Sequence, residues 1–503
     1  MSEAIRIHEN DNVAVMVSAI GRGELLPAFG IHALQDIPQG HKIALRDLKH
    51  GEPVVRYGVE LGNLVRDIPA GTWVVDDLFE LPPSPALSDL KAGGKGAYPS
   101  RLPERRTWMG FEIPGYPYAG TRNILGISTT VQCVAGPLRV AVDRIRREIL
   151  PKYPHVDDVS PLIHPYGCGV AIDAPDAYIP IRSIRNLIRN PNFGGEIMLV
   201  SLGCEKLTVD RLLSSEEIAP DNVIVLQECR GFSGMIDAIC TLAEKKLAIL
   251  DERRRTELPL SRLCIGTQCG GSDAFSGISA NPSIGYAFDL LAAGGATVMF
   301  SEVTEVRDGV HLLAQRCSSQ ETVENLKREI GWYDAYLARG GADRSANPTP
   351  GNHAGGLSNI VEKAMGSIAK SGHAPICEVV GPGQIPSKGG LVFAATPASD
   401  IVCGPTQLAS GITLQVFSTG RGTPYSLREA PVIKIATRHE LLERWPDLFD
   451  VDAGFIITGE KTIPEVGMEL YDMILDVASG RESEAEKLGL YNDLIIDNPA
   501  PIT

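Results

Sequence analysis

The sequence predicts a small β-rich unit followed by a larger α/β body with mostly parallel sheets. Short β-prone runs separated by Gly and Pro fill residues 1–80, and a Pro- and Gly-rich linker follows at 81–108. From residue 109 onward, apolar runs alternate with stretches of helical periodicity, as in α/β proteins. At 503 residues the chain is too long for one hydrophobic core, so we expect several domains.

The strands of the first unit are predicted at Val13–Val17, Ile43–Leu45, Val54–Tyr57 and Thr72–Val75. Within the body, the charged run Asp251–Arg255 divides a middle domain (109–255) from a C-terminal domain (256–503). The predicted body strands lie at 124–128, 197–202, 223–226, 263–266, 297–300, 376–380, 391–395, 413–417, 433–436 and 455–458, with helical stripes of apolar residues such as Leu138, Val142, Ile145 and Ile149 between them.

Composition and charge narrow the function classes. A formal net charge of −15 without a long Lys/Arg-rich run argues against nucleic-acid and acidic-membrane partners. The N-terminus has no leader pattern and no stretch of eighteen apolar residues occurs, so we expect a cytoplasmic protein. The ten cysteines include no Cys-x-x-Cys pair, which disfavours structural zinc and thioredoxin-type chemistry.

Several common motifs are missing from the sequence. It contains no G-x-x-x-x-G-K-[ST] phosphate loop and no complete G-x-G-x-x-G after a predicted strand, which weakens nucleotide binding. It also contains no H-E-x-x-H and no G-x-S-x-G, which weakens zinc hydrolase and serine esterase interpretations.

Reactive side chains gather where predicted strands end. Ligands of open α/β sheets bind beyond the carboxyl ends of strands, so these positions predict an active site. The segment 266–305 is the richest, because its Gly-rich turn and the loop after the next strand carry Cys269, Ser272, Asp273, Glu302 and Glu305. Other strand ends carry His164, Cys168 and Glu205.

Arginines near glycines predict carboxylate recognition, since a guanidinium fork matches a carboxylate in two hydrogen bonds. Arg122 with its neighbour Asn123, Arg307 and Arg421 are the candidates. Lys363 shares helical spacing with Glu362, Gly366 and Lys370. This spacing fits either a solvated helix face or a buried catalytic lysine.

The chain resembles the altronate/galactarate dehydratase family over essentially its whole length. The segment Asp36–Leu45 looks like the SAF-type β-clip domain of that family, which identifies the first unit. The other matching strings are Gly120–Asn123, Tyr166–Val170, Leu202–Leu207, Gln268–Gly277, Phe300–Asp308, Arg344–Gly351 and Thr396–Asp400.

The resemblance implies removal of water from galactarate to give 5-dehydro-4-deoxy-D-glucarate, with ferrous iron (Fe2+) as cofactor. Altronate or another sugar acid remains a possible substrate, because epimers differ only in hydroxyl direction. The chemistry needs a cation on the substrate carboxylate, a base for the α-proton and an acid for the leaving hydroxyl. We expect His41 or Lys42 of the small unit to take part in proton transfer.

The metal ligands are expected among His164, Cys168, Glu205, Cys269, Asp273, Glu302 and Glu305, and spacing does not select three of them. The expected partners are a small sugar diacid and a second copy of the chain in a homodimer. Two alternatives stay open. One is an iron–sulfur hydro-lyase using Cys168, Cys204, Cys269 or Cys403, and the other is a non-catalytic sugar-acid sensor.

Overall fold

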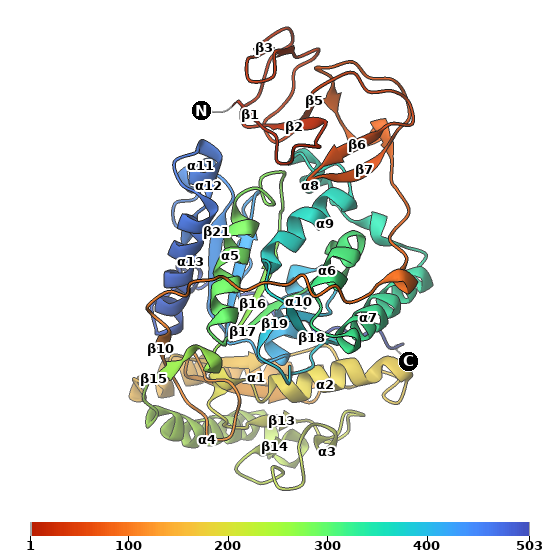
Figure 1. The fold of residues 1–503 in the computed structure, drawn as a ribbon. Helices are drawn as coiled ribbons and strands as arrows, with labels where there is room; N and C mark the ends of the chain where they lie inside the picture. Colours follow the sequence, from red (N-terminus) through yellow and green to blue (C-terminus); the bar gives the residue numbers. More distant parts are fainter. Residues whose placement is uncertain (1–2, 502–503) are drawn as a thin grey trace.

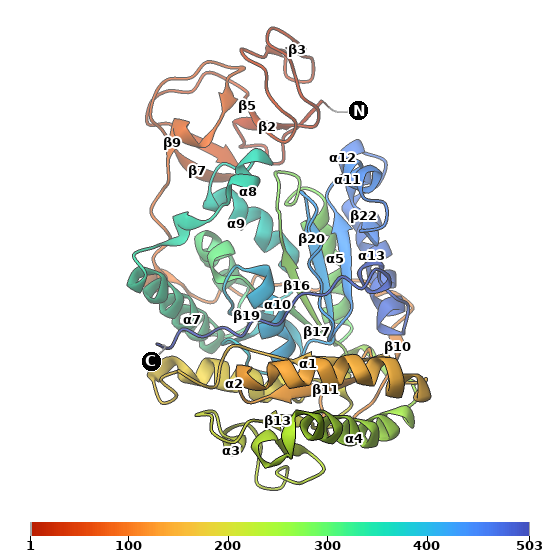
Figure 2. The same cartoon turned by 180° about the vertical axis from the view of Figure 1, so that it is seen from behind.

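The computed structural model describes residues 3–501 and stacks three parts along its length. The N-terminal domain caps one end, the middle domain lies at the other, and a large parallel sheet stands between them (Figures 1 and 2). This arrangement confirms the predicted fold class of a small β domain before an α/β body.

The N-terminal domain (3–80) is built from short antiparallel strands around apolar clusters that include Val13, Ile43 and Val54. Its sheets have the orders β1-β2-β5-β8, β6-β7-β9 and β3-β4. The strands are β1 (Ala4–Ile5), β2 (Val13–Met16), β3 (Leu25–Leu26), β4 (Ile31–His32), β5 (Lys42–Ala44), β6 (Pro53–Arg56), β7 (Val59–Leu64), β8 (Trp73–Val74) and β9 (Phe79–Glu80).

The middle domain carries a four-stranded parallel sheet in the order β12-β11-β13-β14. Helices α1 and α4 pack together over one apolar cluster, and α2 packs against α10 of the C-terminal domain (Figure 2). The elements are β11 (Ile124–Thr129), α1 (Ala135–Arg144), β12 (Asp158–Leu162), α2 (Tyr178–Leu187), β13 (Leu199–Ser201), α3 (Val209–Leu212), β14 (Val223–Val225) and α4 (Gly231–Asp251).

The C-terminal domain holds a seven-stranded parallel sheet in the order β18-β19-β17-β16-β20-β21-β22. Its strands are β16 (Cys264–Cys269), β17 (Thr297–Phe300), β18 (Ile376–Val380), β19 (Gly390–Ala394), β20 (Leu414–Thr419), β21 (Val432–Ala436) and β22 (Val451–Asp452). Every residue of β16, β17, β19, β20 and β21 is buried, because helices cover both faces.

Helices of the C-terminal domain include α5, which packs against α13. They are α5 (Ala280–Ala293), α6 (Val310–Arg316), α7 (Gln320–Arg339), α8 (Pro350–Ala354), α9 (Ile360–Ile368), α10 (Asp400–Ala409), α11 (His439–Arg444), α12 (Gly454–Thr458), α13 (Ile463–Ala478) and α14 (Glu484–Lys487). Strand β10 (Thr107–Gly110) pairs with β15 (Thr256–Pro259), so the end of the linker lies beside the start of this domain.

The predicted strand at 455–458 is wrong, because these residues form helix α12. The Asp452 carboxylate accepts the backbone N–H of Gly454 at 2.7 Å, and Gly459 ends the helix with a φ of +78°. This local capping outweighs the β preference of the two isoleucines in the run. The sheet edge is formed just upstream by β22 instead.

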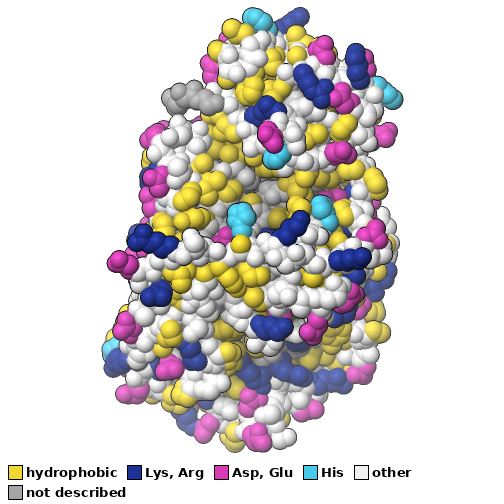
Figure 3. Space-filling model, viewed as in Figure 1, with side chains coloured by type: hydrophobic (Ala, Val, Ile, Leu, Met, Phe, Trp, Pro, Cys, Tyr) yellow, Lys and Arg dark blue, Asp and Glu magenta, His cyan; other side chains and the backbone are white. Residues whose placement is uncertain are grey.

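Acidic and basic side chains are interspersed over the face drawn in Figure 3. Within residues 3–501, no helix combines the length and apolar character needed to cross a membrane.

Candidate active site and metal centre

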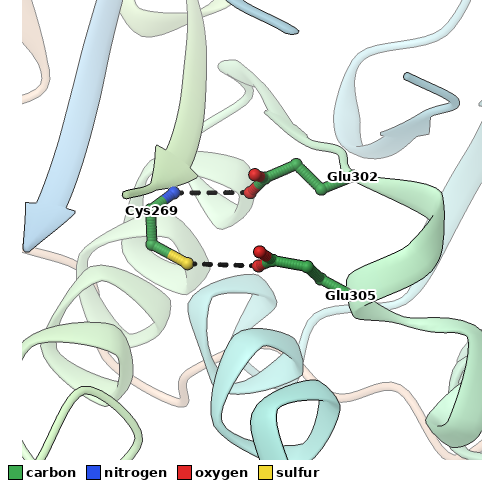
Figure 4. A group of neighbouring side chains, drawn as sticks. All are labelled: Cys269, Glu302 and Glu305. Atoms are coloured by element: carbon green, nitrogen blue, oxygen red, sulfur yellow. Dashed lines mark hydrogen bonds between the residues drawn. The ribbon is translucent and has the colours of Figure 1, made fainter. Parts of the chain in front are cut away.

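Three reactive side chains, Cys269, Glu302 and Glu305, meet near the carboxyl ends of two neighbouring strands. Cys269 is the last residue of β16, and the two glutamates follow the paired strand β17. One ligand atom from each lies within 4.8 Å of the others, and all three residues are buried. Figure 4 shows the three side chains facing one another. In residues 3–501 this is the one group of three Cys, His, Asp or Glu side chains with ligand atoms so close together.

Hydrogen bonds hold the three side chains in place. The Cys269 thiol lies 3.3 Å from Glu305 Oε2, and the backbone N–H of Cys269 donates to Glu302 Oε2 at 3.3 Å. Ser367 donates to Glu305 at 2.9 Å. Glu302 has a φ of +74°, a left-handed conformation that costs a non-glycine residue about 1–3 kcal/mol. The donation of its N–H to the Thr396 hydroxyl, at 3.1 Å, helps to hold this strained backbone.

Two buried lysines complete the cluster. Lys370, just after α9, places Nζ 3.0 Å from Cys269 Sγ, 2.8 Å from Glu302 Oε2 and 3.8 Å from Glu305 Oε2. Lys363 Nζ lies 2.8 Å from Glu305 Oε1 and 2.8 Å from Asn347 Oδ1. Lys363 is therefore buried and ion-paired, not on a solvated helix face, while its catalytic role stays a prediction.

Burial and nearby charges shift the pKa values of these groups in different directions. Burial, with the neighbouring Glu305 charge, raises the pKa of Glu302 to about 7. Burial alone would raise the pKa of Glu305 as well, but Lys363 and Lys370 outweigh it and lower that pKa to about 2. Burial raises the pKa of Cys269 to about 12. A cation bound here would compete with protons on Cys269 and Glu302.

The turn after Cys269 depends on its glycines. A Cβ on Gly270 would lie 2.2 Å from Asp400 Oδ2, and one on Gly271, whose φ is +59°, would lie 3.2 Å from the Arg421 Cβ. These close approaches place Asp400 and the exposed Arg421 beside the turn. Burial, followed by the Glu305 charge, raises the pKa of Asp400 to about 6.

A cavity of about 10 Å³ adjoins the cluster, lined by residues that include Cys269, Ser272, Lys363 and Ser367. Ser272 also donates its hydroxyl to Cys269 Sγ at 3.3 Å. The cavity has room for roughly one water molecule. A ligand larger than water therefore enters this cavity only if a neighbouring segment moves.

The N-terminal domain contacts this region through backbone. A Cβ on Gly356, whose φ is +93°, would lie 2.1 Å from the Gly40 carbonyl oxygen. The next residue, His41, is partly buried and its Nδ1 accepts the indole N–H of Trp73 at 3.1 Å. Burial, followed by the charge of Lys42, lowers the pKa of His41.

Lys42 is buried and its Nζ lies 3.0 Å from Glu362 and 2.6 Å from the Gly356 carbonyl. Arg56 pairs with the same carboxylate. These contacts tie the N-terminal domain to α9 of the body. Asp273 is likewise engaged, because Thr437 and Ser276 donate to it and Arg438 Nε lies 3.3 Å away.

The other predicted arginines are occupied within the protein. Arg122 pairs with both oxygens of Glu486, at 2.7 and 2.8 Å, and lines a separate cavity of about 430 Å³. Asn123 donates its amide to the His155 and Leu250 carbonyls. Arg307 pairs with Asp334 at 2.9 Å.

The remaining predicted metal ligands lie in the middle domain. His164 Nε2 donates to the Thr129 carbonyl at 2.8 Å, and burial lowers its pKa to about 4. It lines a cavity of about 410 Å³ that also includes residues of the C-terminal domain. Cys168 is exposed, and Glu205 accepts five hydrogen bonds from neighbouring loops. The seven candidate ligands therefore separate into two domains.

Lys370 and Asp400 were missing from the predicted site. Lys370 lies seven residues, two helical turns, after Lys363, so the shared face was visible in the sequence. Asp400 lies at the start of α10, and its approach to Gly270 depends on the packing of α10 against β16.

Three family models match successive parts of the chain. Residues 2–81 match the altronate/galactarate dehydratase SAF domain. Residues 116–251 match the D-galactarate dehydratase/altronate hydrolase second domain, and residues 260–501 match the D-galactarate/altronate dehydratase C-terminal domain. The first match identifies the N-terminal domain as a SAF domain, as predicted.

Curated relatives cover nearly the whole chain. The galactarate dehydratase (L-threo-forming) of Escherichia coli (strain K12) is 52% identical over 99% of this chain and 97% of its own length. The altronate dehydratase of Bacillus subtilis (strain 168) is 32% identical over 97% of both chains. The altronate dehydratase of Escherichia coli (strain K12) is 31% identical over 96% of both. The chain therefore belongs to the altronate/galactarate dehydratase family.

Proposed function

We propose that this dehydratase removes water from galactarate to give 5-dehydro-4-deoxy-D-glucarate at the cluster of Cys269, Glu302 and Glu305. The observation that carries the proposal is the buried meeting of a thiol, two carboxylates and two lysines at adjacent strand ends. The substrate is inferred from the relatives, because identity to the galactarate dehydratase is 52% and identity to the two altronate dehydratases is 32% and 31%.

The cluster fits a divalent cation in its donor chemistry, and we propose Fe2+. A thiolate and two carboxylates within 4.8 Å of one another supply three ligands and three negative charges when deprotonated. Lys370 Nζ now lies among the same atoms, so its side chain would shift to admit the ion. When bound, the cation would polarise the substrate carboxylate and so acidify the adjacent C–H bond.

The proton transfers are assigned to residues around the cluster. His41 suits the base, because its lowered pKa leaves the imidazole neutral at neutral pH. Lys42 acts on it through charge while anchoring the domain to Glu362. Lys363 keeps its proton, because Glu305 and Cys269 raise its pKa in spite of burial, so it suits the donor to the leaving hydroxyl.

Arg421 and Ser272 are the proposed contacts for the substrate carboxylates. Arg421 is exposed beside Gly271, whereas Arg122 and Arg307 have their guanidinium groups paired with internal carboxylates. The 10 Å³ cavity requires an opening step, and we assign it to movement of the N-terminal domain over the Gly40–Gly356 contact. We expect a homodimer, the commonest assembly of soluble enzymes.

The test measures α-keto acid formation from galactarate, glucarate, talarate and altronate, each with and without Fe2+. We expect galactarate to give the highest kcat/KM and Glu305→Gln to remove turnover. Arg421→Ala should raise KM for galactarate, with Arg444→Ala, another surface arginine, as its control. Preference for altronate, or full turnover in Cys269→Ala, would contradict the proposal.

A further inference from the structure

Three exposed cysteines follow three adjacent strands of the middle-domain sheet. Cys133 comes four residues after β11, Cys168 six residues after β12 and Cys204 three residues after β13. These strands are parallel neighbours in the order β12-β11-β13. Because the carboxyl ends of parallel strands lie at one edge of a sheet, the three thiols are carried to the same edge.

The buried Glu205 carboxylate joins two of the loops that carry these cysteines. The Glu205 carboxylate accepts the Thr130 hydroxyl after β11 and the backbone N–H groups of Gly203 and Cys204 after β13, the latter two at 2.7 and 2.9 Å. This carboxylate therefore fixes the first and third loops together.

The second loop is held against the other two. The Gly167 carbonyl accepts the backbone N–H groups of Lys206 and Leu207, both at 3.1 Å. A Cβ on Gly167, whose φ is +114°, would lie 2.0 Å from the Thr130 carbonyl oxygen. Because Gly167 is held in this way, its neighbour Cys168 lies close to the loops of Cys133 and Cys204.

The Cys204 sulfur already accepts a side-chain hydrogen bond, because Gln227 Nε2 donates to it at 3.3 Å. Such bonds favour thiolate sulfur and tune sulfur ligands of iron. Cys229 follows the fourth strand, but its thiol donates to the Val225 carbonyl at 3.7 Å, so we leave it outside the set.

The spacing selects the kind of metal group. A single tetrahedral ion with metal–sulfur bonds of about 2.3 Å holds its sulfurs roughly 3.8 Å apart. Within residues 3–501, the group of three metal-binding side chains with ligand atoms within 4.8 Å of one another is Cys269, Glu302 and Glu305, so the three thiols do not form a closed site for a single ion. In a polynuclear cluster each cysteine binds a different iron, so the sulfurs do not have to share one ion.

We propose that Cys133, Cys168 and Cys204 bind an iron–sulfur cluster at this edge of the middle domain. A [4Fe–4S] cluster usually takes four cysteines, so three protein thiolates leave one iron open to water or an oxygen ligand. The site is separate from Cys269, Glu302 and Glu305, which lie in the C-terminal domain. It does not depend on the dehydration proposed above.

The test uses the full-length protein purified without oxygen and reconstituted with ferrous iron, ferric iron and sulfide. We expect acid-labile sulfide and a broad visible absorption, both lost in Cys133→Ser, Cys168→Ser and Cys204→Ser. Cys377→Ser, a partly buried thiol of the C-terminal domain, and Cys269→Ser should keep both signals. Absence of labile sulfide in the wild-type protein, or its retention in all three variants, would overturn the proposal.

Alkylation of the wild-type protein gives a second readout that does not depend on how the variants fold. The three thiols are exposed, so iodoacetamide should label them rapidly once iron is removed, and slowly in the reconstituted protein. Mass spectrometry of the peptides measures each rate. Equal labelling before and after iron removal would also overturn the proposal.

Discussion

At the scale of single residues, Lys370 is the group on which the catalytic cluster depends most. Its ammonium group contacts a thiol and a carboxylate, lies near a second carboxylate, and is fully buried. Burial opposes its charge, but Cys269, Glu302 and Glu305 outweigh burial and raise its pKa well above the usual value. The lysine therefore keeps its charge and neutralises the cluster when no other cation is present.

Replacing this lysine tests that role. Lys370→Met removes the ion-pair partner of Glu302 and leaves Glu305 paired with Lys363, and breaking a buried pair costs about 3–5 kcal/mol. We expect the free energy of unfolding to fall by about 3 kcal/mol and turnover to be lost. Urea unfolding and a galactarate assay measure the two effects. The exposed Lys388→Met is the control, and equal stability of the two variants would refute this role.

The two glutamates predict opposite pH effects on the metal-free protein. The pKa of Glu302 is raised from 4.5 to about 7, so its ionisation destabilises the fold as pH rises through that window. The pKa of Glu305 is lowered from 4.5 to about 2, so its stabilisation is present above pH 4.5 and is lost as pH falls toward 2.

Glu302→Gln should therefore gain stability relative to the wild type between about pH 4.5 and 7. Glu305→Gln should be less stable at neutral pH, with the difference shrinking as pH falls below 4.5. Chemical unfolding at several pH values, with a chelator present, measures how the stability of each variant changes with pH. Parallel stability curves for the two variants would show that the pKa assignment is wrong.

At the scale of elements, the contact between the turn before β5 and the loop between α8 and α9 positions the N-terminal domain. Gly40 and Gly356 approach so closely that no side chain fits between them. Lys42 and Arg56 add buried ion pairs to Glu362 on α9. The contact therefore combines steric fit with charge.

Gly356→Ala tests this contact against a matched control. Its φ is +93° and its new Cβ would clash with Gly40, whereas Gly341 has a φ of +68° and nothing within 4 Å of its Cβ position. Both variants share the left-handed strain, so the difference isolates the clash. We expect lower turnover and a lower Tm for Gly356→Ala than for Gly341→Ala. Equal effects would mean that the domain contact does not matter for activity.

At the scale of the whole molecule, strand and helix alternation predicted the α/β body with mostly parallel sheets, because buried parallel strands are continuous apolar runs. Cys269, Glu302 and Glu305 could be assigned to one predicted active site because they lie at the ends of two successive predicted strands. Their selection from seven candidate ligands needed the pairing of β16 with β17 in the structure. The ion-pair partners of Arg122 and Arg307 could not be predicted, since Glu486 lies far along the chain and Asp334 lies on a different helix. Such pairings depend on how the domains pack.

Metal removal tests the molecule as a whole. Prolonged dialysis against a chelator should abolish turnover, and Fe2+ should restore it better than Mg2+, because a thiolate ligand favours the softer ion. Turnover and bound metal are measured on the same samples. In Cys269→Ser, the turnover restored by Fe2+ should exceed the turnover restored by Mg2+ by a smaller factor than in the wild type. Full activity after complete metal removal would contradict a cation-dependent reaction.

The order of strands in the large sheet has a consequence for biosynthesis. Strand β16 ends at the thiol and β17 precedes the two carboxylates. These strands are flanked by β20 and β19, and both of those leave the ribosome later. We therefore expect the cluster to stay accessible to solvent until residues 390–419 have been synthesised. We expect the ion to be captured while the chain folds, so protein refolded with Fe2+ should regain more turnover than protein given Fe2+ afterwards.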